Sequence, residues 1–447
     1  MEIVSVVDEG LGHSSHIIEL GDGAALVVDP ARLPDRQRRL AAERGWELAW
    51  TADTHSHADY ISGSPELTDE GAVFLAPARA RLEHSHRAVE PGEEVALADG
   101  LALRAIPTPG HTPEHLAYLL LDRGSPMALF SGGSLMVGTV GRTDLLGDER
   151  REELAAKLFR ALRDEILVLP DDLAVYPTHG AGSFCSAPSS SERTTTIGHE
   201  RATNPLLQVT NERPFVEQLL AGLGSFPTYF RELPERNRHG VRHYRAVPAL
   251  PRLSAGEVGA HLDQGAMLVD VRPIGEFAAG HPRGALSNAL RPVFGSWLGW
   301  LVELDRPLIF VLAEGQDRSE LVRQCLTVGH ENLLGELDGG VRTWHSAGYP
   351  IAAIPLVDPA AMAGAVLDVR QDGEWAAGHL PAARHIELGN LRSEDVTADP
   401  LTVMCGHGER AMTAASLLAA RGHGHLSVLA GGSAEWAAVT NTELVTA

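Results

Sequence analysis

Cysteine, long apolar segments and positive charge are all scarce in this chain of 447 residues. Three scattered cysteines are too few for a disulfide framework or a cysteine-rich zinc site. No apolar run reaches the roughly 18 to 20 residues that span a bilayer, and Met1-Glu2-Ile3 does not begin a secretory signal. We therefore expect a cytoplasmic protein without a membrane partner, in which each cysteine must be judged alone.

The charge balance excludes further partners. Lys and Arg number 37 against 59 Asp and Glu, which gives a formal charge of −22. Nucleic acid and anionic lipid both require clustered cations, so neither is an expected partner. The hydrophobic share of 44% is that of a globular protein, and the length predicts two to four domains.

Short apolar strands alternate with turns in the first part of the chain. The patterns predict helices over residues 33–44 and 150–163. They predict strands over residues 24–28, 46–51, 101–106, 115–121, 127–130 and 174–176. Residues 1–245 therefore form one predicted α/β domain.

The second part of the chain contains an internal repeat. Asp-Val-Arg and Gly-Glu-aromatic-Ala-Ala-Gly-His recur 98 residues later, from 270–281 to 368–379. A Gly-Gly pair followed by Trp recurs 92 residues later, from 339–344 to 431–436, so the second copy is six residues shorter. Each copy reads strand–helix–strand–helix, which predicts two α/β domains with parallel sheets, over residues 250–352 and 357–447.

Histidines gather where predicted strands end. His55, His57 and Asp59 form an HxHxD motif, His111 stands in a Pro-Gly-His-Thr turn, and His179 follows another strand. Any one of them alone is most simply a surface-loop histidine. Imidazoles and a carboxylate at several strand ends can instead converge on one metal ion. The pattern as a whole predicts such a site.

The order of these motifs resembles the metallo-β-lactamase superfamily, over most of residues 1–210. More narrowly, it is similar to the persulfide dioxygenase branch in forms with C-terminal rhodanese domains. The resemblance implies an αβ/βα sandwich with a metal at one edge. It rests on HxHxD, PGHT, Ser131-Gly132-Gly133, Gly141-Arg142-Thr143-Asp144 and the His179 motif.

The resemblance also implies the cofactor and its ligands. One iron(II) per domain would be held by His55, by His111 and by an aspartate just after a strand, leaving positions for a thiol persulfide and dioxygen. Tyr60 stands where binuclear relatives need another histidine, so a second metal is not expected. Residues expected to orient the site or contact substrate are Asp59, Arg142, Asp144, His179 and Cys185.

One position departs from the family pattern. Gly133 stands where the ligand aspartate belongs, and glycine has no side chain with which to bind a metal. His57 is a candidate third ligand, and Ser134 a candidate through water. The other interpretation is a domain that keeps the fold and only binds or positions substrate. Cys185, after a Gly-rich stretch, is either a thiol near the substrate or a small apolar filler.

Cys405 lies between a predicted strand over 401–404 and a predicted helix over 411–420. Loop N–H groups and the positive end of that helix favour a thiolate or persulfide anion there. The loop resembles the rhodanese active site, with the six-residue length associated with sulfurtransferases. Its other members are Gly406, His407, Gly408, Glu409 and Arg410. Arg410 is expected either to secure the loop or to help balance the charge of the anion.

The first copy keeps the arginine but not the nucleophile. Arg318 matches Arg410, and Ala313 stands at the position of Cys405, 92 residues earlier. This copy is therefore predicted to be inactive as a sulfurtransferase. Cys325 falls on an apolar helix position and is expected in the core.

Three hypotheses follow for the function. The first is an enzyme that oxidises thiol persulfides to sulfite with iron and transfers sulfur through Cys405. The second is a sulfurtransferase alone, with a metal-deficient scaffold domain. The third is a non-enzymatic persulfide carrier or sensor. The expected small-molecule partners are a thiol persulfide or thiosulfate and dioxygen, and we expect a homodimer.

Overall fold

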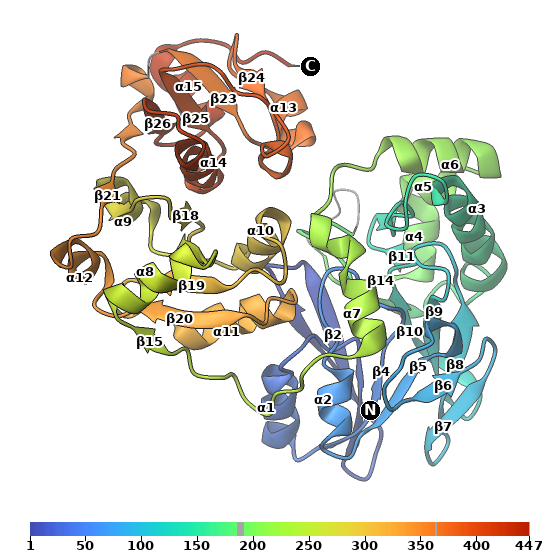
Figure 1. Cartoon of the computed structure of the whole chain (residues 1–447). Helices are drawn as coiled ribbons and strands as arrows, with labels where there is room; N and C mark the ends of the chain where they lie inside the picture. Colours follow the sequence, from blue (N-terminus) through green and yellow to red (C-terminus); the bar gives the residue numbers. More distant parts are fainter. Residues whose placement is uncertain (186–191, 363, 447) are drawn as a thin grey trace. The chain divides into compact units, whose positions relative to one another are not determined.

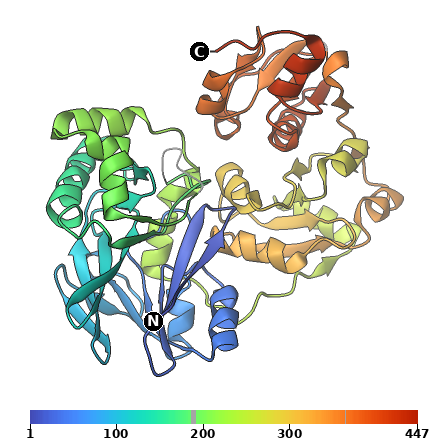
Figure 2. The same cartoon turned by 180° about the vertical axis from the view of Figure 1, so that it is seen from behind.

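The computed structural model describes residues 1–185, 192–362 and 364–446. The chain divides into two units, Met1–Val247 with Arg323–Gly329, and Pro248–Val322 with His330–Ala447. Two six-stranded sheets belong to the first unit and two five-stranded parallel sheets to the second (Figures 1 and 2). Within the described ranges, no helix has the length and apolar character needed to cross a membrane.

The first unit is built on two sheets that face each other. One has the order β1 (Ile3–Asp8), β2 (His13–Glu19), β3 (Ala24–Val28), β4 (Glu47–Ala52), β5 (Val73–Pro77), β6 (Arg87–Val89). The other has the order β14 (Thr195–Thr196), β13 (Ala174–Pro177), β10 (Ser125–Gly132), β9 (Leu116–Asp122), β8 (Leu101–Pro107), β7 (Glu94–Ala98). A small hairpin joins β11 (Leu135–Met136) to β12 (Thr139–Val140).

Alternation along the strands creates the layers of this unit. In β9, Leu116, Tyr118 and Leu120 pack into the core between the two sheets. The intervening residues Leu119 and Leu121 face the opposite way and pack in the core with helix α3 (Arg151–Ala161). Successive side chains of a strand point to opposite faces, so one strand serves two cores.

Helices cover the outer faces of both sheets. The result is the αβ/βα sandwich that the resemblance predicts. The remaining helices of the unit are α1 (Asp35–Arg44), α2 (Ser64–Thr68), α4 (Ile197–Thr203), α5 (Pro205–Gln208), α6 (Glu212–Ala221) and α7 (Leu233–His239). The predicted helix over 150–163 corresponds to α3, which continues into a π-helical turn over Leu162–Ile166.

Strand direction brings the functional loops to one edge. Strands β3 and β4 are parallel, so the segments after Val28 and Ala52 leave the first sheet on the same side. In the second sheet β10 is parallel to β13, and β8 and β10 both run antiparallel to β9. The segments after β8, β10 and β13 therefore also share an edge.

The first rhodanese-like repeat has a fully parallel sheet. Its order is β15 (Arg252–Leu253), β20 (Leu333–Leu337), β19 (Leu308–Val311), β16 (Met267–Asp270), β18 (Leu286–Ser287). Its helices are α8 (Ala255–Asp263), α9 (Ile274–Ala279), α10 (Phe294–Leu301), α11 (Arg318–Thr327) and α12 (Gly340–Ser346). Every residue of β19 is buried, as expected of a strand covered on both faces.

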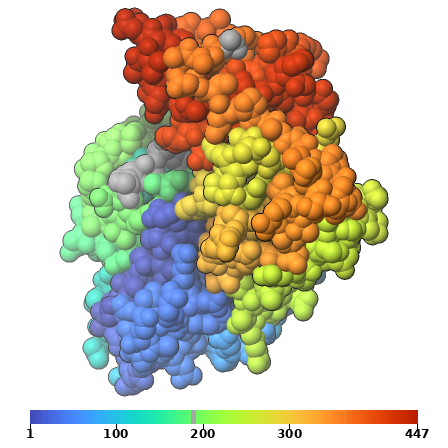
Figure 3. All heavy atoms as spheres, turned by 90° about the vertical axis from the view of Figure 1, so that its left-hand side faces the viewer, coloured from blue at the N-terminus to red at the C-terminus, as the bar shows by residue number. Residues whose placement is uncertain are grey.

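The sheet of the second repeat has its strands in the equivalent order. The last residues of this repeat, coloured red, lie together in Figure 3. The sheet runs β22 (Leu356–Val357), β26 (Leu426–Leu429), β25 (Leu401–Met404), β23 (Ala365–Asp368), β24 (Arg384–His385). Its helices are α13 (Asp372–Ala377), α14 (Glu409–Ala420) and α15 (Ser433–Thr440). The parallel sheets predicted for both repeats are confirmed, and the domain boundaries remain predictions.

Candidate functional site

The sandwich edge carries a buried histidine cluster. His55 and His57 follow β4, His111 follows β8, and His179 follows β13, and each is at most 2% exposed. A ring nitrogen of His55, of His111 and of His179 lies within 4.8 Å of those of the other two. The structure thus brings together three histidines from three strand ends.

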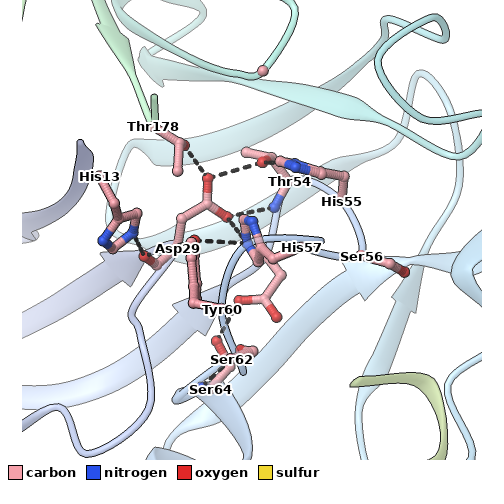
Figure 4. Close-up of polar contacts among 12 residues, drawn as sticks. His13, Asp29, Thr54, His55, Ser56, His57, Tyr60, Ser62, Ser64 and Thr178 are labelled. Carbon is pink, nitrogen blue, oxygen red and sulfur yellow. Dashed lines mark hydrogen bonds and ion pairs between the residues drawn. The ribbon is translucent and has the colours of Figure 1, made fainter. Parts of the chain in front are cut away.

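Asp29, which directly follows β3, organises the loop that carries His55 and His57 (Figure 4). Its carboxylate accepts hydrogen bonds from the Thr54 N–H (2.7 Å), from the Thr54 hydroxyl (2.8 Å) and from the Thr178 hydroxyl. It also lies 3.1 Å from His57 Nε2. Burial alone raises the pKa of Asp29, but His57 and these hydrogen bonds outweigh it and lower the pKa.

His57 lies against Asp29 rather than in the group of three. Its Nε2 is shared between Asp29 and the Tyr60 hydroxyl, 3.0 Å away. Burial alone lowers the pKa of His57, but the charges of Asp29, Asp53 and Asp59 together raise it. His57, Asp59 and His179 form a second group within 4.8 Å, so His179 belongs to both.

His55 and His111 are neutral imidazoles at neutral pH. Burial lowers the pKa of His111 to about 3 and that of His55 well below its usual value, and neighbouring histidines add to both effects. Among the residues that the structure describes, His55 Nε2 and His111 Nε2 have no hydrogen-bond partner. A neutral ring with a buried, unpartnered nitrogen is the form that binds a transition metal.

Arg142 and Asp144, predicted to orient the site or contact substrate, form an ion pair that we call the Arg142 clamp, in which Arg142 is buried and Asp144 is half-buried. Arg142 Nε and Nη2 lie 2.7 and 2.8 Å from the two oxygens of Asp144. The guanidinium also donates to the carbonyls of Phe184 (2.7 Å) and Gly224 (2.8 Å). The Arg142 carbonyl lies 2.8 Å from His111 Nδ1, so the clamp positions His111 through the backbone.

Cys185 lies in this part of the sandwich and is fully buried. Burial, reinforced by the charge of Asp59, raises the pKa of its thiol well above the usual value. A thiol with a raised pKa stays protonated and is a poor nucleophile. These properties favour the apolar-filler interpretation over that of a reactive thiol.

Gly133 makes room for His111. A Cβ atom on Gly133 would lie 2.3 Å from Cδ2 of the His111 ring, so any side chain there would force the ring to move. The Gly133 N–H donates to His115 Nε2 (2.9 Å). Ser134 donates its hydroxyl hydrogen to the Ser131 carbonyl (2.6 Å), which ties it to the turn.

The second site is the Cys405 loop between β25 and α14. The Gly408 N–H donates to Cys405 Sγ at 3.1 Å, and Cys405 is 1% exposed. Gly408 has φ 100°, a left-handed conformation that suits glycine. His407 is exposed, whereas Gly406 and Glu409 are half-buried. The loop therefore directs a backbone donor at the sulfur.

Arg410 is held by α13. Its two terminal nitrogens lie 2.6 and 2.8 Å from the oxygens of Glu374. Burial opposes ionisation of both groups, but their contact lowers the pKa of Glu374 and raises that of Arg410. Gly432 leaves room for the Cys405 loop, because a Cβ atom on residue 432 would lie only 2.4 Å from the Gly406 carbonyl oxygen.

In the first repeat the corresponding loop is filled by a side chain. The Ala313 N–H donates to Gln316 Oε1 (2.7 Å), and Gln316 Nε2 donates to the Val271 carbonyl (2.8 Å). Arg318 lies 2.9 Å from Glu336. Cys325 is fully buried, as expected from the sequence.

The sequence interpretation missed Asp29 and His115. His115 stacks on His55 with ring centroids 4.8 Å apart, and its nitrogens contact Gly133 and Thr108. Asp29 follows an apolar strand, as the predicted histidines do, so the same strand-end signal would have found it. Its interaction with Thr178 depends on tertiary structure and has no signal in the sequence.

Comparison with known proteins agrees with this geometry. The chain is 30% identical over 195 residues to the human persulfide dioxygenase ETHE1, mitochondrial, a match that covers 42% of this chain and 68% of that protein. A metallo-β-lactamase structure from Staphylococcus aureus superimposes with a TM-score of 0.66 at 25% identity, covering 75% of this chain and 98% of the other. The chain belongs to the persulfide dioxygenase family of the metallo-β-lactamase fold.

The fused domains and a second group of relatives complete the comparison. The family profile of the rhodanese-like domain matches residues 254–347 and 356–439, so the predicted fusion is confirmed. The chain is also 31% identical over 162 residues to the hydroxyacylglutathione hydrolase of Polaromonas sp.. That match covers 35% of this chain and 57% of the hydrolase, so the chain spans little more than half of this relative.

Proposed function

We propose that this chain is an enzyme that consumes thiol persulfides at two centres. One is the histidine cluster of the sandwich, and the other is Cys405 in the second rhodanese-like repeat. The observation that carries the proposal is the Gly408 N–H directed at Cys405 Sγ at 3.1 Å, at the start of α14. Such a donor stabilises a negative sulfur, whether thiolate or persulfide.

At Cys405 the proposed reaction is sulfur transfer. The Cys405 sulfur attacks the outer sulfur of a thiol persulfide, the S–S bond breaks, and the free thiol leaves with a proton. Sulfite then attacks the outer sulfur held on Cys405, which forms thiosulfate and regenerates the cysteine. Arg410, fixed by Glu374, lies in the same loop and balances the anionic charge of the substrate.

At the histidine cluster the proposed reaction is oxidation. A thiol persulfide, dioxygen and water give a free thiol, sulfite and two protons, which balances atoms and electrons. Iron(II), when bound, would supply the one-electron chemistry that dioxygen requires. His55 and His111 fit this ion, since each offers a buried Nε2 without a partner. Asp29 and the Arg142 clamp hold their loops in place.

The test is oxygen uptake together with sulfite formation by iron(II)-loaded protein supplied with glutathione persulfide. The expected result is uptake by the natural protein and its loss in His111→Ala, which removes one nitrogen of the cluster. A matched control is His199→Ala, outside the cluster on α4, which should leave uptake unchanged. Absence of uptake in the iron-loaded natural protein would contradict the oxidation.

One observation favours a second candidate, a sulfurtransferase alone. Gly133 stands where the family resemblance places a carboxylate ligand, and the His111 ring occupies the space such a side chain would need. In that case the sandwich would serve as a scaffold. Cys405→Ser would then abolish all activity, whereas under our proposal it would leave oxygen uptake intact.

A further inference from the structure

The hydrogen bonds of His55 fix which of its nitrogens can bind a metal. The Thr54 hydroxyl donates its hydrogen to Asp29 Oδ2 (2.8 Å), so toward His55 Nδ1, also 2.8 Å away, the hydroxyl oxygen is an acceptor. His55 Nδ1 therefore carries the ring proton. Its Nε2 is left with a lone pair, buried and without a partner in residues 1–185, 192–362 and 364–446.

His111 follows the same logic. Its Nδ1 lies 2.8 Å from the Arg142 carbonyl, which can only accept, so Nδ1 carries the proton. Nε2 again holds a buried lone pair, with no partner in the same described residues. Both rings thus present the same atom toward the cluster, and each is oriented by an oxygen behind it, as is usual for metal-binding histidines.

His179 completes the set. Its Nδ1 lies 3.3 Å from Asp59 Oδ2, and neither ring nitrogen makes a hydrogen bond within the described part of the chain. The nearby carboxylate charge favours the tautomer with the proton on Nδ1, which leaves the buried Nε2 with the lone pair. The three ring centroids are 4.9 Å (His55–His111), 5.6 Å (His55–His179) and 5.6 Å (His111–His179) apart, so the rings surround one point.

We propose that His55, His111 and His179 form a three-imidazole site for a divalent first-row transition metal, bound through the three Nε2 atoms. His179 takes the place of the carboxylate that Gly133 cannot provide. Asp59 holds His179 from behind and supplies the nearby negative charge without binding the ion. The inference concerns the ligands alone and holds whichever reaction the sandwich performs.

The surroundings of Gly133 agree with this assignment. The His111 ring lies where an aspartate side chain at position 133 would begin, and a Cβ on Gly141 would also lie 3.0 Å from the same ring. Two glycines therefore leave space for His111. His57 is the alternative third ligand. Its Nε2 is engaged by Asp29 and Tyr60. Its Nδ1 is buried and has no hydrogen-bond partner among the described residues, but His57 groups with Asp59 and His179 rather than with His55 and His111.

The experiment loads the full chain with one equivalent of cobalt(II) and counts the paramagnetically shifted, solvent-exchangeable proton signals by NMR. Each bound imidazole that keeps an N–H gives one such signal. The three histidines predict three signals in the natural protein, two in His179→Ala and three in His57→Ala. Cobalt affinity, measured by competition with a chelator, should fall by more than about 100-fold in His179→Ala, since losing a ligand costs more than losing an outer partner.

Two results would overturn the proposal. One is two signals in the natural protein, a count that needs no variant. The other is loss of a signal in His57→Ala with none lost in His179→Ala. Where His179→Ala fails to fold, His179→Gln takes its place, and the natural count still decides. Because cobalt binding is read without any persulfide, its failure is distinguishable from failure of the proposed oxidation.

Discussion

The two rhodanese-like repeats use the same loop position in opposite ways. In the second repeat the Gly408 N–H points at Cys405 Sγ. In the first, the residue 92 positions before Gly408 is Gln316, and its side chain bonds the Ala313 N–H and the Val271 carbonyl. The first repeat therefore differs from the second by more than the missing cysteine, because the Gln316 side chain fills the loop that corresponds to the Cys405 loop.

The arginines of the two loops are also paired differently. Arg410 is bound by Glu374 of α13, next to the Cys405 loop. The corresponding acid of the first repeat, Glu276, lies instead 3.7 Å from Arg272. Arg318 is bound by Glu336 of β20. Arg318 and Arg410 occupy matching positions in the two repeats but therefore have different structural roles.

Among the changes that test this comparison, replacing Cys405 is expected to have the largest effect on sulfur transfer. Cys405→Ser is expected to lower anaerobic sulfur transfer from glutathione persulfide to sulfite by at least about 10³-fold, because no other group in the loop can carry sulfur. Cys325→Ser, in the core of the first repeat, is the matched control and should transfer sulfur normally once folded. Transfer that survives in Cys405→Ser would refute the assignment.

Replacing the arginine of each repeat is expected to have a smaller effect on the rate of sulfur transfer, and the effect should differ between the repeats. Arg410→Ala is expected to reduce kcat/KM for sulfur transfer about 10- to 100-fold, the size of a lost charge-assisted contact. Arg318→Ala should leave this rate unchanged, because its partner Glu336 lies in the repeat that has Ala313 in place of the cysteine. Steady-state kinetics of both variants decide the point, and equal losses would mean that the repeats act together.

Restoring a cysteine in the first repeat tests the filled loop itself. In a Cys405→Ser background, Ala313→Cys should remain unable to take up sulfur, because Gln316 still occupies the loop. Ala313→Cys combined with Gln316→Gly should accept one sulfur atom from glutathione persulfide, detected by intact-protein mass spectrometry. Uptake by the single Ala313→Cys change would show that only the cysteine had been lost.

The smallest effect concerns the glycines behind the loops. Gly432→Ala places a Cβ 2.4 Å from the Gly406 carbonyl oxygen and should cost about 1–3 kcal/mol of unfolding free energy through overpacking. In the matched variant Gly340→Ala, the Cβ meets no described atom closer than 4.0 Å. Its cost in unfolding free energy, about 1–2 kcal/mol, comes only from the left-handed backbone conformation at this position. Only Gly432→Ala should also slow sulfur transfer, and denaturation with kinetics of both variants tests this.

Much of this architecture could be predicted from local patterns. Strand β3 was predicted from the apolar run over 24–28, and the two parallel sheets were predicted from the repeat offsets. The order of strand, cysteine and helix around 401–420 was also predicted correctly. These predictions succeeded because the residues that end a strand or begin a helix are close to it in the sequence. The histidines at strand ends were found for the same reason. The partner of His57 and the space around Gly133 could not be found, since Asp29 and the His111 ring reach them only through the folded sheets.

We keep as predictions iron as the metal, a cytoplasmic location, the homodimer and the individual roles of the site residues. The two candidate sites differ in kind. One offers neutral imidazole nitrogens to a metal, and the other offers a backbone N–H to a sulfur anion.

The most direct test of two separate centres is the partition of products in Cys405→Ser. Iron-loaded natural protein and variant receive glutathione persulfide in aerated buffer, and oxygen, sulfite and thiosulfate are followed together, with the spontaneous reaction subtracted. We predict thiosulfate from the natural protein only, with undiminished oxygen uptake and accumulating sulfite in the variant. Loss of oxygen uptake together with thiosulfate in Cys405→Ser would contradict the account.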